Sequence, residues 1–245
     1  MPATGATGGP RDLRCSTVLL LAFDTATPAV TVALHDGTHV LAEENATGAR
    51  QHGELLAALI ERVLARGGRE RADLDAVAVG TGPGPYTGLR AGLVTARVLA
   101  SALGIPAVGV CTLDVIARAA APAAAGREFV VAADARRKEV YWARYAPGGQ
   151  RIGDPAVGPP GEIAAAGTGG PVPVAGEGPA LYPELGACPI PPRYPDAAHL
   201  AQIAARSLAE HPVPGLPEPL YLRQPDAREP GQPKRVTPAR AGEAR

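Results

Sequence analysis

The sequence predicts an α/β fold, on three observations. Apolar runs of strand length alternate along the chain with longer segments whose apolar residues recur every three to four positions, as in helices. Three consecutive strands precede the first of these helices. Of the 245 residues, 46% are apolar, enough for a substantial core, and the length corresponds to one large domain or two small ones.

The N-terminal strands are indicated by apolar patterning and turn residues. Residues 17–23 form an uninterrupted apolar run, which is typical of a strand buried on both faces. After a turn, residues 30–34 form a second strand. Asp36-Gly37 is a hairpin sequence that leads into a third strand at 39–43.

Helices and strands then alternate through the first half of the chain. Apolar residues with helical spacing predict a helix at 51–65, which Gly67 and Gly68 end. The next elements are a strand at 75–79, a helix at 87–103 with Thr87 as its N-cap and Gly104 as its stop, a strand at 107–110 and a helix at 112–120.

The second half is less regular. We expect strands at 128–133 and 139–145, a further strand at 172–175, and a last helix at 197–210 with apolar residues on one face. Residues 1–15 and 224–245 are rich in Gly, Pro and polar residues and are predicted to be a disordered extension and a disordered tail.

The composition of the chain argues against several classes of protein. Lys plus Arg (24) equals Asp plus Glu (24), so the chain lacks the basic surplus of proteins that coat nucleic acid or acidic membranes. The three cysteines show neither a metal-binding nor a disulfide spacing. The longest apolar run, residues 18–23, is too short to cross a bilayer. We therefore expect a cytoplasmic protein without a membrane partner.

Two segments of the sequence are candidate nucleotide sites. The loop Gly82-Pro-Gly-Pro-Tyr-Thr-Gly88 precedes a helix, but it lacks a G-K-[ST] ending, and its prolines remove N–H donors that would hold phosphate. Asp24 and Thr25 follow a buried strand and could hold the phosphates of a Mg-nucleotide or satisfy a turn. With no Lys or Arg beside them, the turn is favoured, and they remain the only candidates for cofactor binding.

The sequence also disfavours a metal site at His52 and a docking surface at residues 134–139. His52 opens the first helix, but the position one turn on, where a second ligand would stand, is Leu56. The charged residues 134–139 could form a docking surface or a solvated hairpin, and composition favours the hairpin. We therefore predict no metal site and no catalytic residue.

The second helix is apolar on two sides. One face includes Leu89, Leu93 and Ala96, and the adjoining face includes Val94 and Val98. Because a surface helix normally has one apolar stripe, the second side is expected to pack on the first helix or on a partner. Gly88 and Gly92 form a small-x-x-x-small step, and Arg90 and Arg97 lie at the rim.

Several of these segments together resemble the TsaB family, the bacterial subunit of the tRNA threonylcarbamoyladenosine system. The matching segments, in order through residues 17–145, are Ala22-Phe-Asp-Thr-Ala-Thr27, His52-Gly-Glu-Leu55, Gly82 to Gly92, Cys111-Thr-Leu113, Asp134-Ala-Arg136 and Glu139-Val-Tyr141, with Tyr221-Leu-Arg223 as a late match. The G-P-G-x-[FY]-T-G-[LVI]-R stretch is the most specific. Pro85-Tyr86 departs from the common Ser-Phe, so no ligand contact is carried over there.

The resemblance implies an actin-like (Hsp70/sugar-kinase) fold of two related subdomains, at 16–111 and 112–223, with the helix at 197–210 packing back on the first. It implies a non-catalytic scaffold required with TsaD for transfer of a threonylcarbamoyl group to N6 of adenosine 37, in tRNAs reading codons that start with A. The interface with TsaD is then expected on the first two helices. Its predicted residues are His52, Leu55, Leu56, Leu59, Gly88, Leu89, Arg90, Gly92, Leu93, Val94 and Arg97.

The resemblance also implies further partners. The ATPase TsaE would bind transiently, tRNA contact would be mainly indirect, and ATP or ADP would bind only at an interface of the complex, none being held by this chain alone. Two alternatives stay open: a stand-alone actin-like ATP-dependent enzyme or metallohydrolase, and a protein whose homodimer is the working form.

Overall fold

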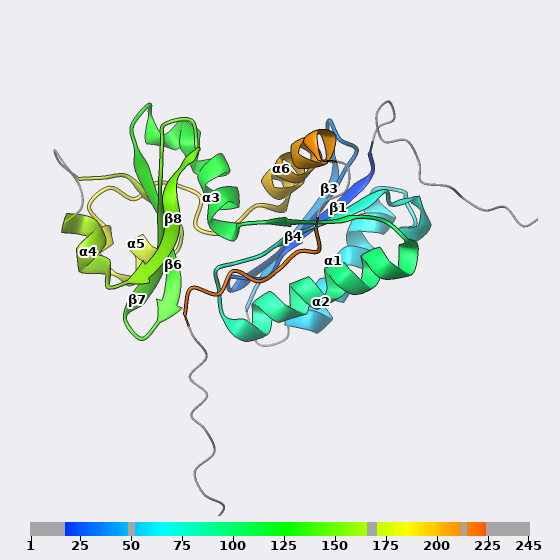
Figure 1. Cartoon of the computed structure of the whole chain (residues 1–245), viewed down its shortest axis with the longest axis horizontal. Coiled ribbons are helices and arrows are strands. Elements are labelled where there is room, and N and C mark those ends of the chain that lie inside the picture. Colours follow the sequence, from blue (N-terminus) through cyan, green and yellow to red (C-terminus); the bar gives the residue numbers. More distant parts are fainter. Residues whose placement is uncertain (1–17, 49–51, 166–170, 212–214, 224–245) are drawn as a thin grey trace, which may run out of the picture.

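The computed structural model describes residues 18–48, 52–165, 171–211 and 215–223 and contains two mixed sheets with helices around them (Figure 1). The predicted disorder of residues 1–15 and 224–245 falls outside the described residues. The strands predicted near the N-terminus and the helices that follow them are all present, so the predicted α/β class is confirmed.

The first sheet has the strand order β3-β2-β1-β4-β5. Its strands are β1 (Leu20–Asp24), β2 (Ala29–His35), β3 (Val40–Thr47), β4 (Ala76–Gly80) and β5 (Ala107–Val110). The pairs β1–β2 and β2–β3 are antiparallel, whereas β4 lies parallel to both β1 and β5.

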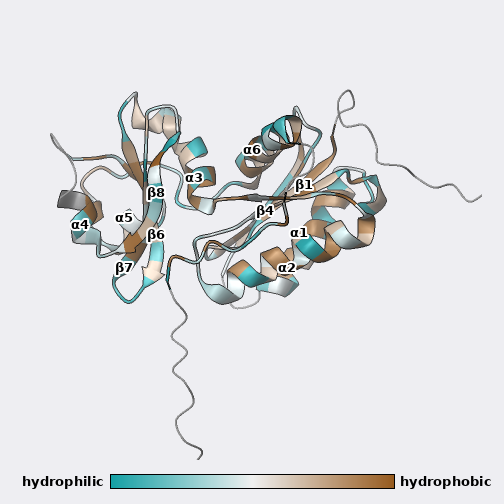
Figure 2. Cartoon of the chain, in the orientation of Figure 1, coloured by the Kyte–Doolittle hydropathy of each residue, from teal (hydrophilic) through white to brown (hydrophobic). Residues whose placement is uncertain are grey.

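Helices cover both faces of this sheet, which is why β1 and β4 are buried throughout. On one face α1 (His52–Arg66) and α2 (Tyr86–Leu103) pack on residues such as Leu21 and Phe23. On the other face α6 (Ala197–Glu210) packs through Leu200. Figure 2 shows the apolar colouring concentrated on β1, β4 and the helices beside them.

The second sheet repeats the topology of the first in the order β8-β7-β6-β9. Its strands are β6 (Phe129–Arg136), β7 (Glu139–Tyr145), β8 (Arg151–Gly158) and β9 (Val174–Ala175). As in the first sheet, three antiparallel strands are extended by a strand parallel to the first of them. This repetition confirms the predicted fold of two related subdomains.

The remaining elements are short. They are α3 (Thr112–Ala120), α4 (Pro160–Ala165), α5 (Gly178–Leu181) and the 3-10 turns η1 (Arg71–Asp73), η2 (Ala121–Ala124) and η3 (Pro183–Leu185). Helix α3 packs on β6 and β7, through Ile116 for example.

The last described segment, residues 215–223, has no helix or strand and is here called the strap. The backbone N–H of Leu220 donates to the carbonyl of Thr81 at 2.8 Å, at the end of β4. Arg223 donates to the carbonyl of Ala135 in β6 at 3.1 Å. The strap therefore crosses from the first subdomain to the second, as its orange-red trace shows (Figure 1).

Candidate functional site: the cleft between the subdomains and the outer face of α2

Asp24 stands at the end of β1 and is fully buried. Its Oδ1 accepts the backbone N–H of Ala26, and its Oδ2 accepts the hydroxyl of Thr112, each at 2.7 Å. The Thr112 hydroxyl oxygen in turn accepts the N–H of Gly82 at 3.1 Å. Burial raises the pKa of the Asp24 carboxyl, with the two hydrogen bonds acting in the opposite direction. Asp24 thus joins β1, α3 and the Gly-Pro loop internally.

Thr25 holds the β1–β2 turn against α2. Its hydroxyl donates to the carbonyl of Gly88 at 2.7 Å. A side chain at Gly88 would overlap the Thr25 carbonyl, and one at Gly92 would overlap the Thr25 hydroxyl. The two glycines are buried and admit the chain's own β1–β2 turn, and their predicted contact with a partner stays a prediction.

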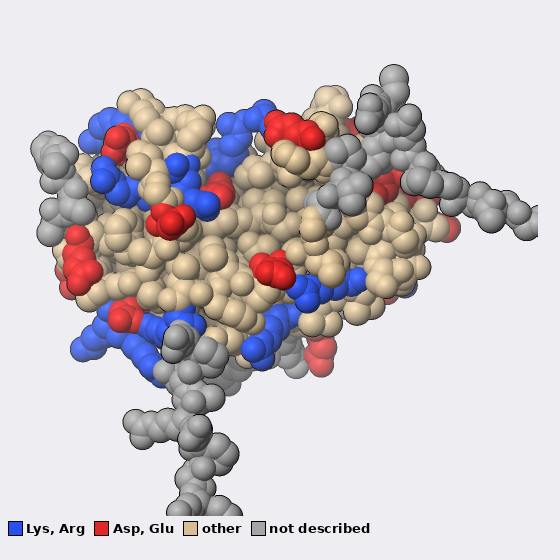
Figure 3. Space-filling view, in the orientation of Figure 1, with Lys and Arg blue, Asp and Glu red and all other residues tan. Residues whose placement is uncertain are grey.

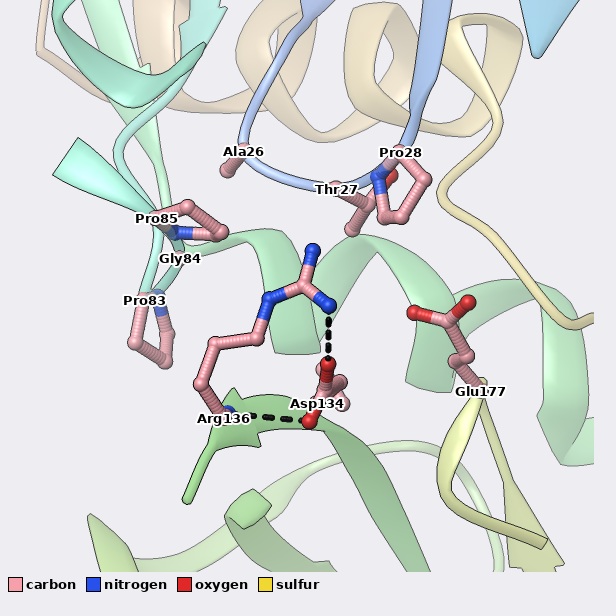
Figure 4. A pocket seen from close by; sticks show the side chains of 10 residues that line it. Ala26, Thr27, Pro28, Pro83, Gly84, Pro85, Asp134, Arg136 and Glu177 are labelled. Carbon is pink, nitrogen blue, oxygen red and sulfur yellow. Dashed lines mark hydrogen bonds and ion pairs between the residues drawn. The ribbon is translucent and has the colours of Figure 1, made fainter. Parts of the chain in front are cut away.

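A narrow cleft separates the β1–β2 turn from the second subdomain (Figure 4). Its walls are residues 26–28 and 83–85 on one side and Ala133, Asp134, Arg136 and Glu177 on the other. The Arg136 guanidinium points into it and pairs with Asp134 at 3.2 Å. The free volume is only about 10 Å³, the room of roughly one water molecule. A nucleotide does not fit this cleft as it stands.

Sequence reasoning missed Glu177. Its carboxylate accepts hydrogen bonds from Arg193 at 3.2 Å and from the Tyr194 hydroxyl at 2.9 Å, and it is largely buried. Gly176-Glu-Gly178 directly after the short strand β9 is the tight-turn sequence that could have indicated it.

A wider hollow of about 580 Å³ lies next to the cleft, where α1 and α2 begin. His52, Glu54, Thr87 and Arg136 are among its lining residues. The His52 ring lies with Nε2 3.2 Å from the carbonyl oxygen of Thr27, which ties the start of α1 to the β1–β2 turn. The predicted N-cap Thr87 lies inside α2, which begins at Tyr86 with Pro85 as its N-cap.

Several predicted interface residues belong to the chain's own core. The leucines at 56, 59, 89 and 93 are buried between the helices and the first sheet, with Leu55 packed partly against them. The family resemblance assigned Leu56, Leu59, Leu89 and Leu93 to a partner interface, whereas in this chain they are buried in its own core. Their contact with a partner stays a prediction.

The other apolar side of α2 is uncovered in this chain. Val94 is 59% exposed and Val98 is 60% exposed. Large apolar side chains on successive turns of one helix form a surface that water covers poorly. Of the predicted interface residues on α2, Val94, Arg90 and Arg97 are the exposed ones.

The strap binds the two rim arginines. Arg97 donates to the carbonyl of Pro217 at 3.1 Å, and Arg90 donates to the Tyr221 hydroxyl at 3.1 Å. The Tyr221 ring stacks on Tyr86 with centroids 4.7 Å apart. The strap therefore forms one border of the uncovered α2 face.

Comparisons with known proteins identify the family to which the chain belongs. A family model described as TsaD: tRNA N6-adenosine threonylcarbamoyltransferase matches residues 39–175. TsaB of Escherichia coli is 39% identical over 127 residues, which are 51% of this chain and 54% of that protein. YeaZ from Pseudomonas aeruginosa superposes with a TM-score of 0.74 at 29% identity, over 84% of this chain and all of that one. The chain belongs to the TsaB (YeaZ-type) family.

Other relatives extend over most of the chain. A protein of Mycobacterium tuberculosis is 44% identical over 213 residues, which are 85% of this chain and 93% of that protein. Among the helices of the described residues, none is both long and apolar enough to span a bilayer. Within the same residues, no group of three or more His, Cys, Asp or Glu side chains is placed to hold a metal ion.

Proposed function

We propose that this TsaB-family chain is the non-catalytic scaffold subunit of cytoplasmic tRNA threonylcarbamoyladenosine biosynthesis. In this role it binds a TsaD-like partner through the outer face of α2 and the adjacent side of α1. It is then needed, together with a TsaE-like ATPase, for threonylcarbamoyl transfer to N6 of adenosine 37 in tRNAs that read codons starting with A. The observation that supports this most directly is the uncovered pair Val94 and Val98.

The proposal explains why α2 is apolar on both sides. Leu89 and Leu93 are needed to bury the helix on its own sheet, whereas Val94 and Val98 serve no contact within the described chain that would bury them. The two valines are 59% and 60% exposed, so burying the rest of their surface removes roughly 2–4 kcal/mol of unfavourable hydration, which favours association over exposure. When the partner is absent, the same face is expected to pair two copies of this chain.

The alternative of a stand-alone ATP-dependent enzyme receives less support. Both carboxylate oxygens of Asp24 accept internal hydrogen bonds, and Arg136 fills the cleft beside it. The expectation that ATP or ADP binds only at an interface of the assembled complex stays a prediction. It is tested by nucleotide titration of the chain alone and of the complex.

The interface is tested by Val94→Glu and Val98→Glu. Each places a charge in a surface that the partner dehydrates, so association with the TsaD-like protein of the same organism should weaken by several kcal/mol, about a hundredfold or more. Light scattering on a sizing column across a concentration series measures this. The matched control is Ile152→Glu, at a 41% exposed apolar residue of β8 in the other subdomain.

The results discriminate between the hypotheses. Normal association of both valine variants would contradict the interface, and absence of any association for the unmodified chain would contradict the scaffold role. ATP hydrolysis by the purified chain, abolished by Asp24→Asn, would establish the stand-alone enzyme instead.

A further inference from the structure

The β6–β7 turn has an unusual backbone. Arg136, Arg137 and Lys138 have φ values of 63°, 56° and 62°, so three consecutive cationic residues are left-handed. Arg136 pairs with Glu139 across the hairpin, which makes Arg137 and Lys138 the two turn residues. Two-residue turns with this backbone are normally built from Asn and Gly, because other L-residues are strained there. Strained backbone of this kind is concentrated at functional sites, so the side chains of this turn are candidates for a function.

The side chains at this turn face solvent. Arg136, Arg137 and Lys138 are all exposed, although Arg136 also reaches the hollow at the start of α2. Figure 3 shows Lys and Arg gathered along the lower edge of the molecule, one group over the β6–β7 turn and another along α2. The exposed cations of α2 are Arg90 and Arg97.

The strap connects the two groups. Tyr221 accepts from Arg90 at 3.1 Å, and two residues on, Arg223 forms an ion pair with Glu139 of β7. The cations along this surface are Arg90, Arg97, Arg136, Arg137, Lys138 and Arg223; among them, Arg136 pairs with Asp134 and Arg223 pairs with Glu139. We call the six cations together the basic ridge.

An exposed aromatic ring lies within the ridge. Tyr221 is 41% exposed and stacks on Tyr86, and the Arg90 guanidinium lies 4.9 Å from the centre of the Tyr86 ring. Cations interleaved with stacked aromatic rings are typical of surfaces that follow a nucleic-acid backbone and accept an unstacked base.

We propose that the basic ridge contacts the sugar–phosphate backbone of the RNA on which the complex acts. This inference rests on the proposed function, which makes tRNA the substrate. The contact is independent of base sequence, because Arg and Lys at a solvent-exposed turn neutralise phosphates without reading base edges. It supplements the partner's own hold on the RNA, in keeping with the zero net charge of the whole chain.

The phosphate backbone is a better occupant than an acidic protein surface. The ridge extends over both subdomains, from α2 through the strap to the β6–β7 turn, and a polynucleotide supplies negative charge at regular intervals over such a length. Arg90 and Arg97 lie on the same face of α2 as Val94 and Val98, where the protein partner is proposed to bind. The three cations of the β6–β7 turn belong to the other subdomain, so they are the part of the ridge that stays available to RNA when the partner is bound.

The test is a double variant that removes charge without disturbing the fold. Arg137→Asn with Lys138→Gly installs the residue types that a left-handed two-residue turn prefers, so the melting temperature should rise. We expect RNA binding by the variant complex with the TsaD-like partner to weaken about tenfold. The slope of log affinity against log salt should become shallower by about two. Fluorescence anisotropy with an unmodified tRNA transcript, titrated at several salt concentrations, measures both.

The matched control removes two cations from the opposite end of the same hairpin. Arg127→Gln with Arg144→Gln changes exposed residues near Phe129 and Tyr145, and RNA binding should stay within twofold. Partner association is measured for every variant by sizing-column light scattering. If the unmodified chain binds its partner but the turn variant binds RNA like the control, the ridge is not an RNA contact. Loss of partner association by the turn variant would show an acidic protein surface there and overturn the inference.

Discussion

Asp24, at the end of β1, is hydrogen-bonded to Thr112 at the start of α3. Asp24 and Thr112 come from different subdomains and share a buried hydrogen bond of 2.7 Å. Thr112 also receives the N–H of Gly82, so one hydroxyl satisfies two buried groups. Buried polar groups are costly when they lose their partners, and this hydroxyl is therefore important for stability.

Replacing Thr112 tests this network. Thr112→Val keeps the volume but leaves the Asp24 carboxylate and the Gly82 N–H without their shared partner. The free energy of unfolding should fall by about 2–4 kcal/mol, measured by urea denaturation. Thr95→Val is the matched control, because the Thr95 hydroxyl only donates to the carbonyl of Ala91 within a partly exposed helix turn. An equal loss in both variants would contradict the shared role of Thr112.

The raised pKa of Asp24 has a consequence for stability against pH. Burial raises the pKa of this carboxyl in the folded chain above its ordinary value of 3.8, so the folded state takes up a proton at a higher pH than the unfolded state. The contribution of Asp24 to stability is therefore largest below 3.8 and is lost as pH rises through the raised pKa. The stability of the natural chain relative to Asp24→Asn should accordingly increase from pH 7 towards pH 4. A pH-independent difference in denaturation would show that the carboxyl does not titrate this way.

At the scale of elements, close approach between α2 and the β1–β2 turn depends on glycine. Gly92→Ala would normally favour a helix by up to about 1 kcal/mol. Here the added methyl group overlaps the Thr25 hydroxyl, so we expect a net loss of about 1–3 kcal/mol. Gly53→Ala in α1 has open space around it and should be neutral or slightly stabilising. Thermal melting of the two variants compares them, and equal melting temperatures would rule out the tight contact.

The positions of helices and strands were predicted from the sequence more accurately than the contacts that they make. Helical and strand periodicity identified α1, α2 and the paired strands β6 and β7. Strand β8 was missed because Pro155 interrupts it, which is tolerated only at a sheet edge such as this one. The interface list that the resemblance implies also included Leu89 and Leu93, which are core residues in this chain.

The site was predicted less completely for a related reason. Asp24 and Thr25 form hydrogen bonds at the β1–β2 turn, as local sequence favoured, and their candidacy for cofactor binding stays a prediction. Glu177 and Arg136 enter the cleft only because two distant subdomains meet there, and no local pattern reports such a meeting. The strap has neither helical nor strand periodicity, so its contacts with Arg90 and Arg97 were beyond pattern analysis.

At the scale of the whole molecule, the strap is a third connection between subdomains that the backbone already joins between β5 and α3 and again between η3 and α6. Its contacts include the Tyr86–Tyr221 stack, the Arg97 bond to Pro217 and the Arg223 pair with Glu139. Gly109 in β5 allows Pro217 to lie against the strand, since a side chain there would crowd it. The strap should therefore restrict movement of the second subdomain relative to the first.

Two truncations test this restriction. Ending the chain after residue 214 removes the strap, whereas ending it after Arg223 removes only residues beyond the described contacts. The longer deletion should lower the free energy of unfolding by about 2–4 kcal/mol, through one aromatic stack and several hydrogen bonds, and the shorter one should change it by less than about 0.5 kcal/mol. Urea denaturation measures the stability, and small-angle scattering measures the spread of subdomain positions. If the two truncated chains behave alike in both measurements, the strap does not hold the subdomains together, and its contacts with Arg90 and Arg97 serve the surface alone.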